Sequence, residues 1–446
     1  MDAFVQKLIA VKPEDRQIAW QSLGFTAFLH YGINTFTNRE WGDGKESPLD
    51  YNPTDLNTDQ WCEVLKSAGM TACTITAKHH DGFCLFDTAF TSHSVMSSPK
   101  PVDVVASLAQ SCAKYGLKLG IYLSPWDRNH PAYGTGKAYD DFFCAQLEEV
   151  TTRYGELYSL WFDGACGEGP NGKRQVYDWP RYYAIIRKNQ PQAAIAVCGP
   201  DVRWIGNEAG YTRSSEWSVV PARLRSTEGT AAQSQQSDDA AFRQRPISSQ
   251  DEDLGSRAFL ANEGDLCWYP AEVNVSIRPG WFYHPEENGQ VRSVDNLLDI
   301  YEKSVGGNAL FLLNIPPDDT GQINPADATT LRALGQRLTA YQANLLVGAE
   351  ITYPASTHPG EVLVTSDAPV TLTRLIICED IRQSQRVEAF TVDAEVDGTW
   401  QQIYAGTTIG FKKICTFDRV QARRWRITIT QCRHVPVINF VGGALV

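Results

Sequence analysis

The sequence predicts a (β/α)8 barrel followed by a C-terminal antiparallel β-sandwich. Residues 1–338 alternate short, almost continuously apolar runs with helical stretches, and beyond about residue 340 the apolar residues instead recur with period two. Continuous apolar strands separated by helices are typical of a parallel sheet buried on both faces, and about eight such units indicate a barrel. We therefore expect two domains, a catalytic barrel over residues 1–338 and a β-sandwich over residues 339–446.

Eight apolar runs are the candidate barrel strands, and the sixth of them is the short run EWSVV. They are residues 25–32, 72–79, 118–125, 159–165, 194–200, 216–220, 266–275 and 308–317. Segments with helical spacing lie between most of them, and the clearest end at glycines, which favour helix C-termini. These predicted helices are residues 58–69, 101–116, 138–155 and 294–307.

One unit of the barrel is irregular, and the end of the chain has a different pattern. Residues 222–262 are polar and poorly periodic, so we expect a long loop region there, beside the active face. Residues 361–380, 386–406 and 423–430 alternate polar and apolar side chains and are separated by turn residues such as Asp397 and Gly398. That pattern predicts an antiparallel β-sandwich.

Composition excludes several classes of partner. The formal net charge is −12, with a pI near 5.2, which argues against nucleic acid and anionic membrane as partners and suits a neutral substrate. No run of about 18 apolar residues is present, so we expect no membrane span.

The 11 cysteines lack CxxC or Cys/His metal spacing, and no cofactor is expected. The cysteines and the absence of a signal-peptide pattern favour the cytoplasm, whereas a removed leader would indicate a periplasmic or secreted protein. The oligomeric state is left open.

Polar side chains gather where the predicted strands end, which is where barrels of this type carry their chemistry. Most of these strand ends or the loops that follow them carry histidine, tryptophan, arginine or carboxylate, although a barrel needs none of these there for packing. The candidate site residues on this rim are His30, Glu40, Trp41, His79, His80, Trp161, Asp163, Arg203, Glu208 and Trp281.

The histidines allow three interpretations. His30, His79, His80 and Asp163 are residue types that could surround a zinc ion. Adjacent histidines on an extended segment point opposite ways, however, which suits a metal cage badly. Neutral imidazoles that hydrogen-bond to the hydroxyls of a polyol are the alternative that we favour, so no metal is expected. A structural role for any single histidine, bonded to backbone, stays open.

Two carboxylates are the candidate reactive groups. Asp163 follows the apolar run that contains Trp161 and Phe162, and it either caps the next turn or attacks a substrate. Cleavage of a glycosidic bond needs one carboxyl group to protonate the leaving oxygen and a second to attack or to activate water. Glu208 lies beyond the next strand end, so a barrel brings it beside Asp163. Glu216 is the nearest competitor for the acid role, but its place at the start of a strand-like run favours a structural role.

The sequence resembles the α-L-fucosidases of glycoside hydrolase family 29 over nearly all of residues 20–325. The motifs HYG, KHHDGF and WFDG occur in the order typical of that family. The resemblance implies that Asp163 is the nucleophile of a retaining mechanism and that Trp281 forms an apolar wall for the C6 methyl group of fucose. It also implies contacts with the fucose hydroxyls from the three histidines and further sugar contacts from Glu40 and Trp41. Trp161 and Arg203, on the same rim, are further candidate substrate contacts.

The segment GPDVRWIGNEAG is similar to the subgroup of this family that cleaves α-1,3- and α-1,4-linked fucose from branched, Lewis-type glycans. In that subgroup the glutamate of GNE is the acid/base, which implies this role for Glu208. We therefore expect a retaining exo-α-L-fucosidase that acts on fucosylated oligosaccharides or glycoconjugates by double displacement. The alternatives are a glycosidase for another sugar on the same fold and a non-catalytic fucose-binding protein.

Overall fold

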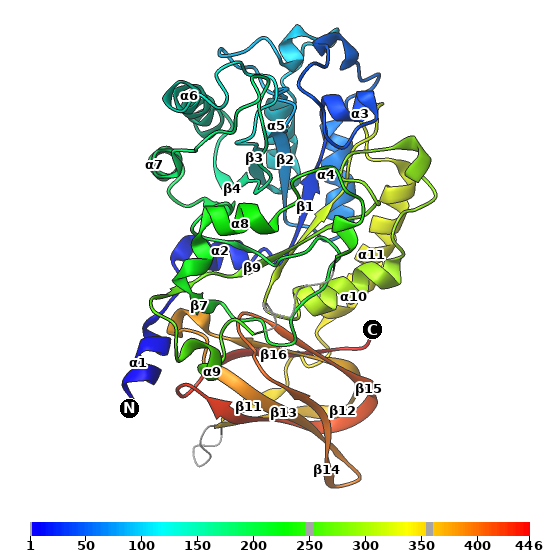
Figure 1. Cartoon of the computed structure of the whole chain (residues 1–446). Helices are drawn as coiled ribbons and strands as arrows, with labels where there is room; N and C mark the ends of the chain where they lie inside the picture. Colours follow the sequence, from blue (N-terminus) through cyan, green and yellow to red (C-terminus); the bar gives the residue numbers. More distant parts are fainter. Residues whose placement is uncertain (1, 246–252, 354–359) are drawn as a thin grey trace.

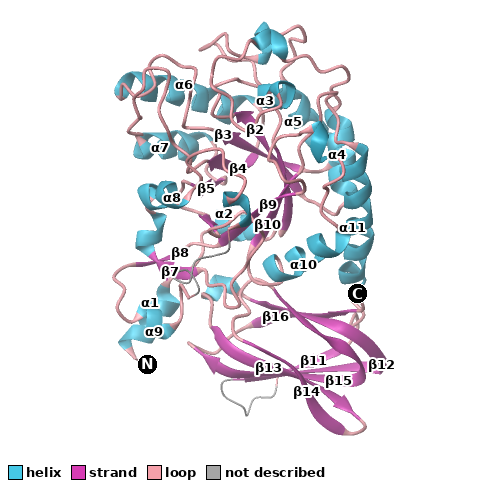
Figure 2. Cartoon of the chain, turned by 45° about the vertical axis from the view of Figure 1, so that its right-hand side comes forward, coloured by secondary structure: helices cyan, strands magenta, loops and turns pink. Residues whose placement is uncertain are grey.

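The chain forms a parallel barrel with a C-terminal antiparallel sheet domain beside it, which confirms the predicted fold class (Figure 1). A computed structural model describes residues 2–245, 253–353 and 360–446. In Figure 2 the barrel strands lie among helices, and the sheet domain lies next to α10. No helix among the described residues is both long and apolar enough to cross a membrane.

The barrel sheet has eight parallel strands in the order β5-β4-β3-β2-β1-β10-β9-β6. An isolated parallel bridge between Ala196 and Val202 joins its two ends, so the barrel is nearly closed. The strands are β1 (Phe25–Leu29), β2 (Ala72–Lys78), β3 (Lys118–Leu123), β4 (Leu157–Phe162), β5 (Ala194–Val197), β6 (Arg203–Trp204), β9 (Ala271–Ser276) and β10 (Leu310–Asn314).

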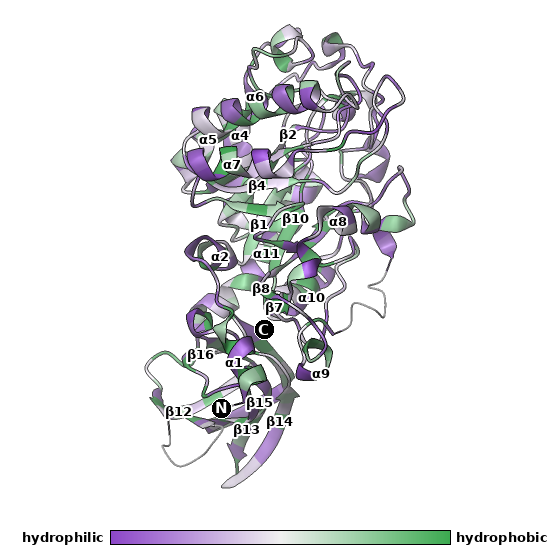
Figure 3. Cartoon of the chain, turned by 60° about the vertical axis from the view of Figure 1, so that its left-hand side comes forward, coloured by the Kyte–Doolittle hydropathy of each residue, from purple (hydrophilic) through white to green (hydrophobic). Residues whose placement is uncertain are grey.

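The strands are apolar because most of them are buried on both faces. In β1 every residue is buried: Phe28 packs with the residues that fill the barrel, whereas Ala27 and Leu29 pack in the larger core under the helices. Successive side chains of a strand point to opposite faces, so a strand covered on both sides needs apolar residues at every position. Figure 3 shows the apolar strands β1 and β10 inside the barrel.

The predicted helices are present, and their ends follow local capping rules. Asp103 caps the first turn of α5, and Gly116 ends it with a left-handed φ of 67°. The helices of the barrel domain are α1 (Ala3–Ala10), α2 (Asp15–Gln21), α3 (Ile33–Thr37), α4 (Thr58–Ser67), α5 (Val104–Tyr115), α6 (Lys137–Arg153), α7 (Trp179–Asn189), α8 (Thr227–Gln233), α9 (Arg257–Leu260), α10 (Val294–Ser304) and α11 (Pro325–Ala343).

Two predicted strands need correction. The run 216–220 is not the sixth barrel strand: β7 (Val219–Pro221) pairs with β8 (Leu266–Trp268) in a separate antiparallel sheet. The sixth barrel strand is β6, which has only two residues and therefore leaves no strand pattern in the sequence. The run 266–275 is not one strand but two, β8 and β9. Pro270, which has no N–H to donate, separates them.

The irregular segment 222–262 folds into short pieces beside the barrel. Its described residues include α8, α9 and the 3₁₀ turns Ala222–Arg225 and Phe242–Gln244. Part of the predicted loop, residues 246–252, lies outside the described residues. The part that is described reaches the rim of the barrel, where it contributes to the candidate site below.

The C-terminal domain is an antiparallel sheet folded around its own core. Its strands are β11 (Glu350–Thr352), β12 (Gly360–Glu379), β13 (Val387–Val396), β14 (Thr399–Gly406), β15 (Lys413–Cys432) and β16 (Ile438–Ala444). The pairing of the two longest strands, β12 and β15, shifts register twice, and residues from both sides of these shifts, such as Val364 and Leu375, share one core. The boundary predicted at residues 338/339 falls inside α11, which continues to Ala343.

A buried ion pair fastens α11 to the barrel. The Arg278 side chain, just beyond β9, is fully buried and donates to the carboxylate of Asp327 in the first turn of α11, at 2.8 and 3.1 Å. Asn288 accepts a further hydrogen bond from the same guanidinium at 3.0 Å. Arg278 lies close to the rim in sequence, but its role here is structural.

We expect Asp327→Ala to lower the free energy of unfolding by about 3–5 kcal/mol, because it leaves the Arg278 charge buried without a partner. The measurement is the urea midpoint followed by circular dichroism. Asp295→Ala is the matched control, since it removes an exposed ion pair with Arg337 and should change stability by less than about 1 kcal/mol. Equal midpoints for the two variants would contradict the assignment.

Candidate active site

The site is built from side chains that share the inner face of the barrel strands. His30 lies two residues after Phe28, and Asp163 lies two residues after Trp161, so each continues the inward side of its strand. They line a pocket of about 620 Å³ at the carboxyl ends of the strands. Its lining consists of Phe28, His30, Glu40, Trp41, His79, His80, Trp161, Asp163, Ala165, Val197, Trp204, Glu208, Ser234, Gln235, Asn274 and Trp281.

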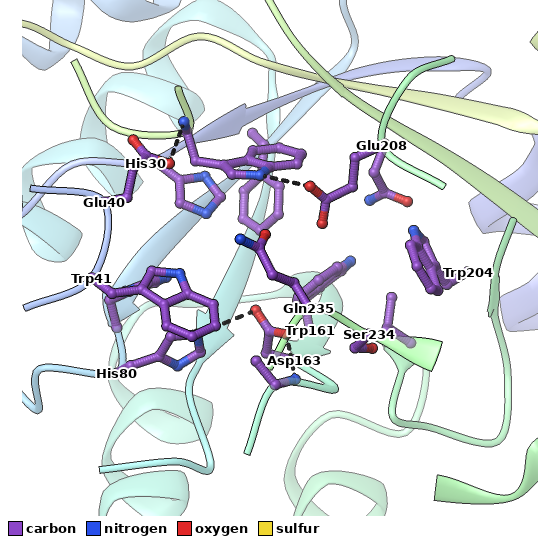
Figure 4. Close-up of a pocket in the computed structure, with 16 residues that line it drawn as sticks. His30, Glu40, Trp41, His80, Trp161, Asp163, Trp204, Glu208, Ser234 and Gln235 are labelled. Carbon is purple, nitrogen blue, oxygen red and sulfur yellow. Dashed lines mark hydrogen bonds and ion pairs between the residues drawn. The ribbon is translucent and has the colours of Figure 1, made fainter. Parts of the chain in front are cut away.

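Nine of the ten residues predicted for the site line this pocket, and Arg203 is the exception. Figure 4 shows Trp41 and His80 on one side of the pocket and Trp204 and Glu208 on the other, with Asp163 between the two sides in the view. The pocket therefore combines aromatic surface with hydrogen-bonding groups and two carboxyl groups, which is the composition needed to hold a sugar.

The three histidines are neutral at physiological pH. Burial lowers the pKa of His30 to about 4 and lowers those of His79 and His80 well below their usual value. His30 is oriented by Asn314, whose Oδ1 lies 2.9 Å from its Nδ1, and His80 by the hydroxyl of Ser124 at 2.8 Å. Neutral imidazoles can both donate to and accept from hydroxyl groups.

The expected opposite orientation of His79 and His80 is wrong. Their ring centroids lie 4.0 Å apart, and both rings line the pocket, because β2 ends at Lys78 and the chain turns at the two histidines. Ligand atoms of His79, His80 and Asp163 all lie within 4.8 Å of one another. The orientation of the two rings therefore no longer argues against a metal ion, and the metal hypothesis needs a direct test.

Asp163 is held in place by hydrogen bonds that favour its ionised form. The hydroxyl of Tyr122 donates to Oδ2 at 3.0 Å, and the backbone N–H of Ala165 donates to Oδ1 at 2.8 Å. Burial raises the pKa of Asp163, and these hydrogen bonds oppose that rise. The side chain remains 22% exposed, on the pocket side, so a substrate can reach its oxygens.

Glu208 is buried as well, but it accepts fewer hydrogen bonds than Asp163. Burial raises the pKa of Glu208 to about 7, and the charge of Asp163 contributes to the rise. Its carboxyl group accepts a hydrogen bond from the indole Nε1 of Trp281 at 3.1 Å, which lowers the pKa by a smaller amount. Much of the Glu208 population therefore carries a proton near neutral pH, as a general acid requires.

Glu40 binds the backbone of the segment that contacts Glu208. Its carboxylate accepts hydrogen bonds from the backbone N–H of Trp281 at 2.8 Å and of Phe282 at 3.0 Å, and His284 Nε2 lies 2.7 Å away. Although burial opposes ionisation, these contacts and the charge of Arg243 lower the pKa of Glu40. Glu40 thus fixes the tryptophan whose indole touches Glu208.

The prediction that Arg203 binds substrate is not supported by its position. Its guanidinium donates to Glu216, whose other oxygen pairs with Arg213 at 3.1 Å. Both arginine charges lower the pKa of Glu216 although burial opposes this, so Glu216 is an ionised structural group outside the pocket lining. The neighbour Trp204 enters the pocket instead, since adjacent residues of β6 face opposite sides.

Several pocket residues had no clear signal in the sequence. Asn274 belongs to the inner face of β9, and Tyr122, which lies beneath the pocket, belongs to that of β3. Ser234 and Gln235 come from the irregular segment after α8. Their segment reaches the site because residue 164 is glycine: a Cβ there would lie 2.0 Å from Ser234 Oγ. This close approach explains the glycine that follows Asp163.

Comparisons with known proteins show the family of the chain. The family model described as α-L-fucosidase matches residues 30–343. Alpha-L-fucosidase 1 of Arabidopsis thaliana is 36% identical over 471 residues, which cover 96% of this chain and 87% of the plant protein.

Solved structures give the same result. The crystal structure of a Bacteroides ovatus protein described as a candidate α-L-fucosidase is 44% identical, has a TM-score of 0.89, and is matched over 100% of this chain and 76% of that one. A Ruminococcus gnavus family 29 fucosidase in complex with fucose is 26% identical, with a TM-score of 0.81 over 98% of this chain and 95% of that one. The chain therefore belongs to the α-L-fucosidases of glycoside hydrolase family 29.

Proposed function

We propose that the protein is a retaining exo-α-L-fucosidase that removes terminal α-1,3- and α-1,4-linked L-fucose from branched, Lewis-type glycans. The observation that carries this proposal is the pair of carboxyl groups in one pocket: burial raises the pKa of both, to about 7 for Glu208, and Asp163 accepts more hydrogen bonds that favour its ionised form than Glu208 does. Two carboxyl groups that share one pocket but differ in their surroundings are typical of glycosidases.

In the first step Asp163 attacks the anomeric carbon while Glu208 gives its proton to the departing glycosidic oxygen, forming a fucosyl-enzyme ester. In the second step Glu208, now ionised, takes a proton from water, whose oxygen attacks the same carbon and releases Asp163 and fucose. The neutral His30, His79 and His80 bind the fucose hydroxyls, and Trp41 and Trp161 line the same space.

Specificity for fucose rather than another sugar is supported by the aromatic lining. Trp281 packs against His30 with ring centroids 5.1 Å apart and is held at its backbone by Glu40. An indole face fixed in this way offers a dry surface to the C6 methyl group, whereas a sugar with a hydroxyl at C6 would leave that hydroxyl unpaired. A glycosidase for another sugar would show no preference for the methyl group.

We expect Asp163→Asn to lower kcat on an aryl fucoside by about 10³-fold or more, because the amide cannot form the ester intermediate. Glu208→Gln should lower kcat by about 10²–10⁴-fold on an oligosaccharide, and by less on an aryl fucoside whose leaving group needs little protonation. Proton NMR of the first product should show α-L-fucose, the anomer of retention.

The control for these variants is Glu168→Gln, which alters an exposed carboxylate on the loop after β4, outside the pocket lining. Full activity of Asp163→Asn, or a first product of β configuration, would refute the mechanism. Treatment of the unmodified enzyme with EDTA should leave its activity intact; loss of activity that zinc restores would instead support the metal hypothesis for His79, His80 and Asp163.

The pH dependence of kcat/KM should be bell-shaped. The acid must be protonated, so activity falls as the pH rises through the Glu208 pKa of about 7. The nucleophile must be ionised, so activity also falls as the pH drops through the raised pKa of Asp163. Trp281→Phe removes the hydrogen bond that lowers the pKa of Glu208 and should move the alkaline limb to higher pH. A shift to lower pH would contradict this assignment.

Linkage preference is tested with matched α-1,2-, α-1,3- and α-1,4-fucosylated oligosaccharides. We expect the α-1,3 and α-1,4 compounds to be hydrolysed in preference, which is the behaviour that the segment GPDVRWIGNEAG implies. Equal or faster hydrolysis of the α-1,2 compound would refute the linkage assignment but leave the fucosidase chemistry intact.

All 11 cysteines have free thiols, and the cytoplasmic location expected from the sequence stays a prediction.

A further inference from the structure

A third carboxyl group lies inside the barrel, on the same inner face of β9 as Asn274. Glu272 is 3% exposed and is not part of the pocket lining. Its Oε1 accepts a hydrogen bond from the indole Nε1 of Trp161 at 2.8 Å and another from Nδ2 of Asn274 at 2.9 Å. Both donors belong to residues that line the pocket, so Glu272 is bonded to two of its walls from behind.

The contact between Glu272 and Trp161 crosses the interior of the barrel. Trp161 belongs to β4 and Glu272 to β9, and β5 and β6 lie between these strands where the barrel closes. Two residues of β5 that pack with Trp161 inside the barrel are the alanines Ala194 and Ala196. Their small side chains leave room for the indole to reach β9.

Two contacts fix the indole of Trp161. Its ring stacks on that of Tyr122, with centroids 5.2 Å apart and an angle of 26° between the planes. Stacking restricts the tilt of an indole but allows it to slide or turn over on its neighbour. The hydrogen bond from Nε1 to Glu272 selects one orientation, in which Trp161 is 8% exposed and lines the pocket.

No cation compensates the carboxyl group of Glu272 within the described parts of the chain. Its side-chain partners there are the neutral Trp161 and Asn274, and burial raises the pKa of Glu272 to about 7. A residue that only filled the barrel would be apolar, because a buried carboxyl group without a charged partner is unfavourable. A buried polar group that breaks an apolar pattern in this way is expected where function requires it.

We propose that Glu272 is a positioning residue for fucose binding, which holds the Trp161 indole and the Asn274 amide in the orientations in which they line the pocket. Groups that bind a substrate must be held to within about 0.5 Å, and buried hydrogen bonds behind them provide this precision. Glu272 itself does not touch the sugar. This inference rests on the proposed fucosidase function and adds a role for a carboxyl group that the two reaction steps do not use.

The test compares Glu272→Asp with Glu272→Gln. The aspartate keeps the carboxyl group but is one methylene shorter, so it cannot reach both donors, whereas the glutamine keeps the reach and an acceptor oxygen. We expect Glu272→Asp to raise the inhibition constant of L-fucose and the KM of an aryl fucoside by about tenfold, the effect of about one buried hydrogen bond. Its kcat should change by less than about threefold, because ground-state and transition-state binding are weakened alike.

Glu272→Gln should keep all three constants within about threefold of those of the unmodified enzyme, because Oε1 still accepts both hydrogen bonds. The urea midpoint of each variant verifies that it folds. If Glu272→Asp does not fold, Glu272→Met, which keeps the volume but has no carboxyl oxygen, replaces it with the same expected result.

Glu379→Asp is the matched control. Glu379 is an equally buried glutamate of the sheet domain, outside the pocket lining, and burial raises its pKa to about 7 as well. It accepts hydrogen bonds from the backbone N–H groups of Arg386 and Gly410. Shortening Glu379 should lower the urea midpoint but leave the KM and the inhibition constant of L-fucose unchanged.

A double-mutant cycle shows whether Glu272 acts through Trp161. Trp161→Phe removes the N–H donor, so adding Glu272→Asp to that variant should raise the inhibition constant of L-fucose by about threefold or less, instead of tenfold. A purely structural role of Glu272 would give the same increase in both backgrounds.

An unchanged inhibition constant in Glu272→Asp, or an equal increase in Glu272→Gln, would overturn the proposal. The fucosidase mechanism is tested separately: if no fucoside is cleaved, the proposed function fails, and calorimetric binding of L-fucose to the unmodified protein and to the two variants still decides the role of Glu272. Weaker binding in Glu272→Asp alone supports that role. Equal binding in all three proteins, or no binding to the unmodified protein, refutes it.

Discussion

The chemistry of this protein depends on one geometric constraint: the strands of the barrel are buried on both faces, so the direction of every side chain is fixed by its position along the strand. Phe28 and His30 share one face of the first strand, and Trp161 and Asp163 share one face of the fourth. The inward positions are apolar within the barrel and polar at its rim. The barrel thus holds its reactive groups at the rim, above tightly packed apolar side chains that fix their positions.

The second determinant is the different environment of the two carboxyl groups. Asp163 sits over Tyr122 and two backbone N–H groups, whereas Glu208 lies against the indole of Trp281. Trp281 in turn is held by Glu40, to which Arg243 of the irregular segment is also paired. Segments remote in the chain therefore contribute to the protonation state of the acid without contacting the reacting carbon.

The division into two domains gives the molecule two adjoining cavities of different character. The pocket is aromatic and contains neutral histidines, which suits a small deoxy-sugar. The second cavity, of about 1760 Å³, is lined by residues 209–214, by residues of α10 and by the sheet domain. Residues 207–214 lie between the two cavities, since Glu208 lines the pocket and residues 209–214 line the second cavity.

The sequence was enough to predict the fold class, the two carboxyl groups and most of the pocket, because strands buried on both faces and polar strand ends leave local patterns. It could not identify the two-residue strand β6, and so it could not tell that Trp204 rather than Arg203 enters the pocket. It also gave the wrong orientation for His79 and His80, because the end of β2 is set by pairing with other strands. Ser234 and Gln235 were beyond its reach for a related reason. They reach the site only through contacts between segments far apart in the chain. Such contacts leave no periodic pattern in either segment, so they become visible only in the folded structure.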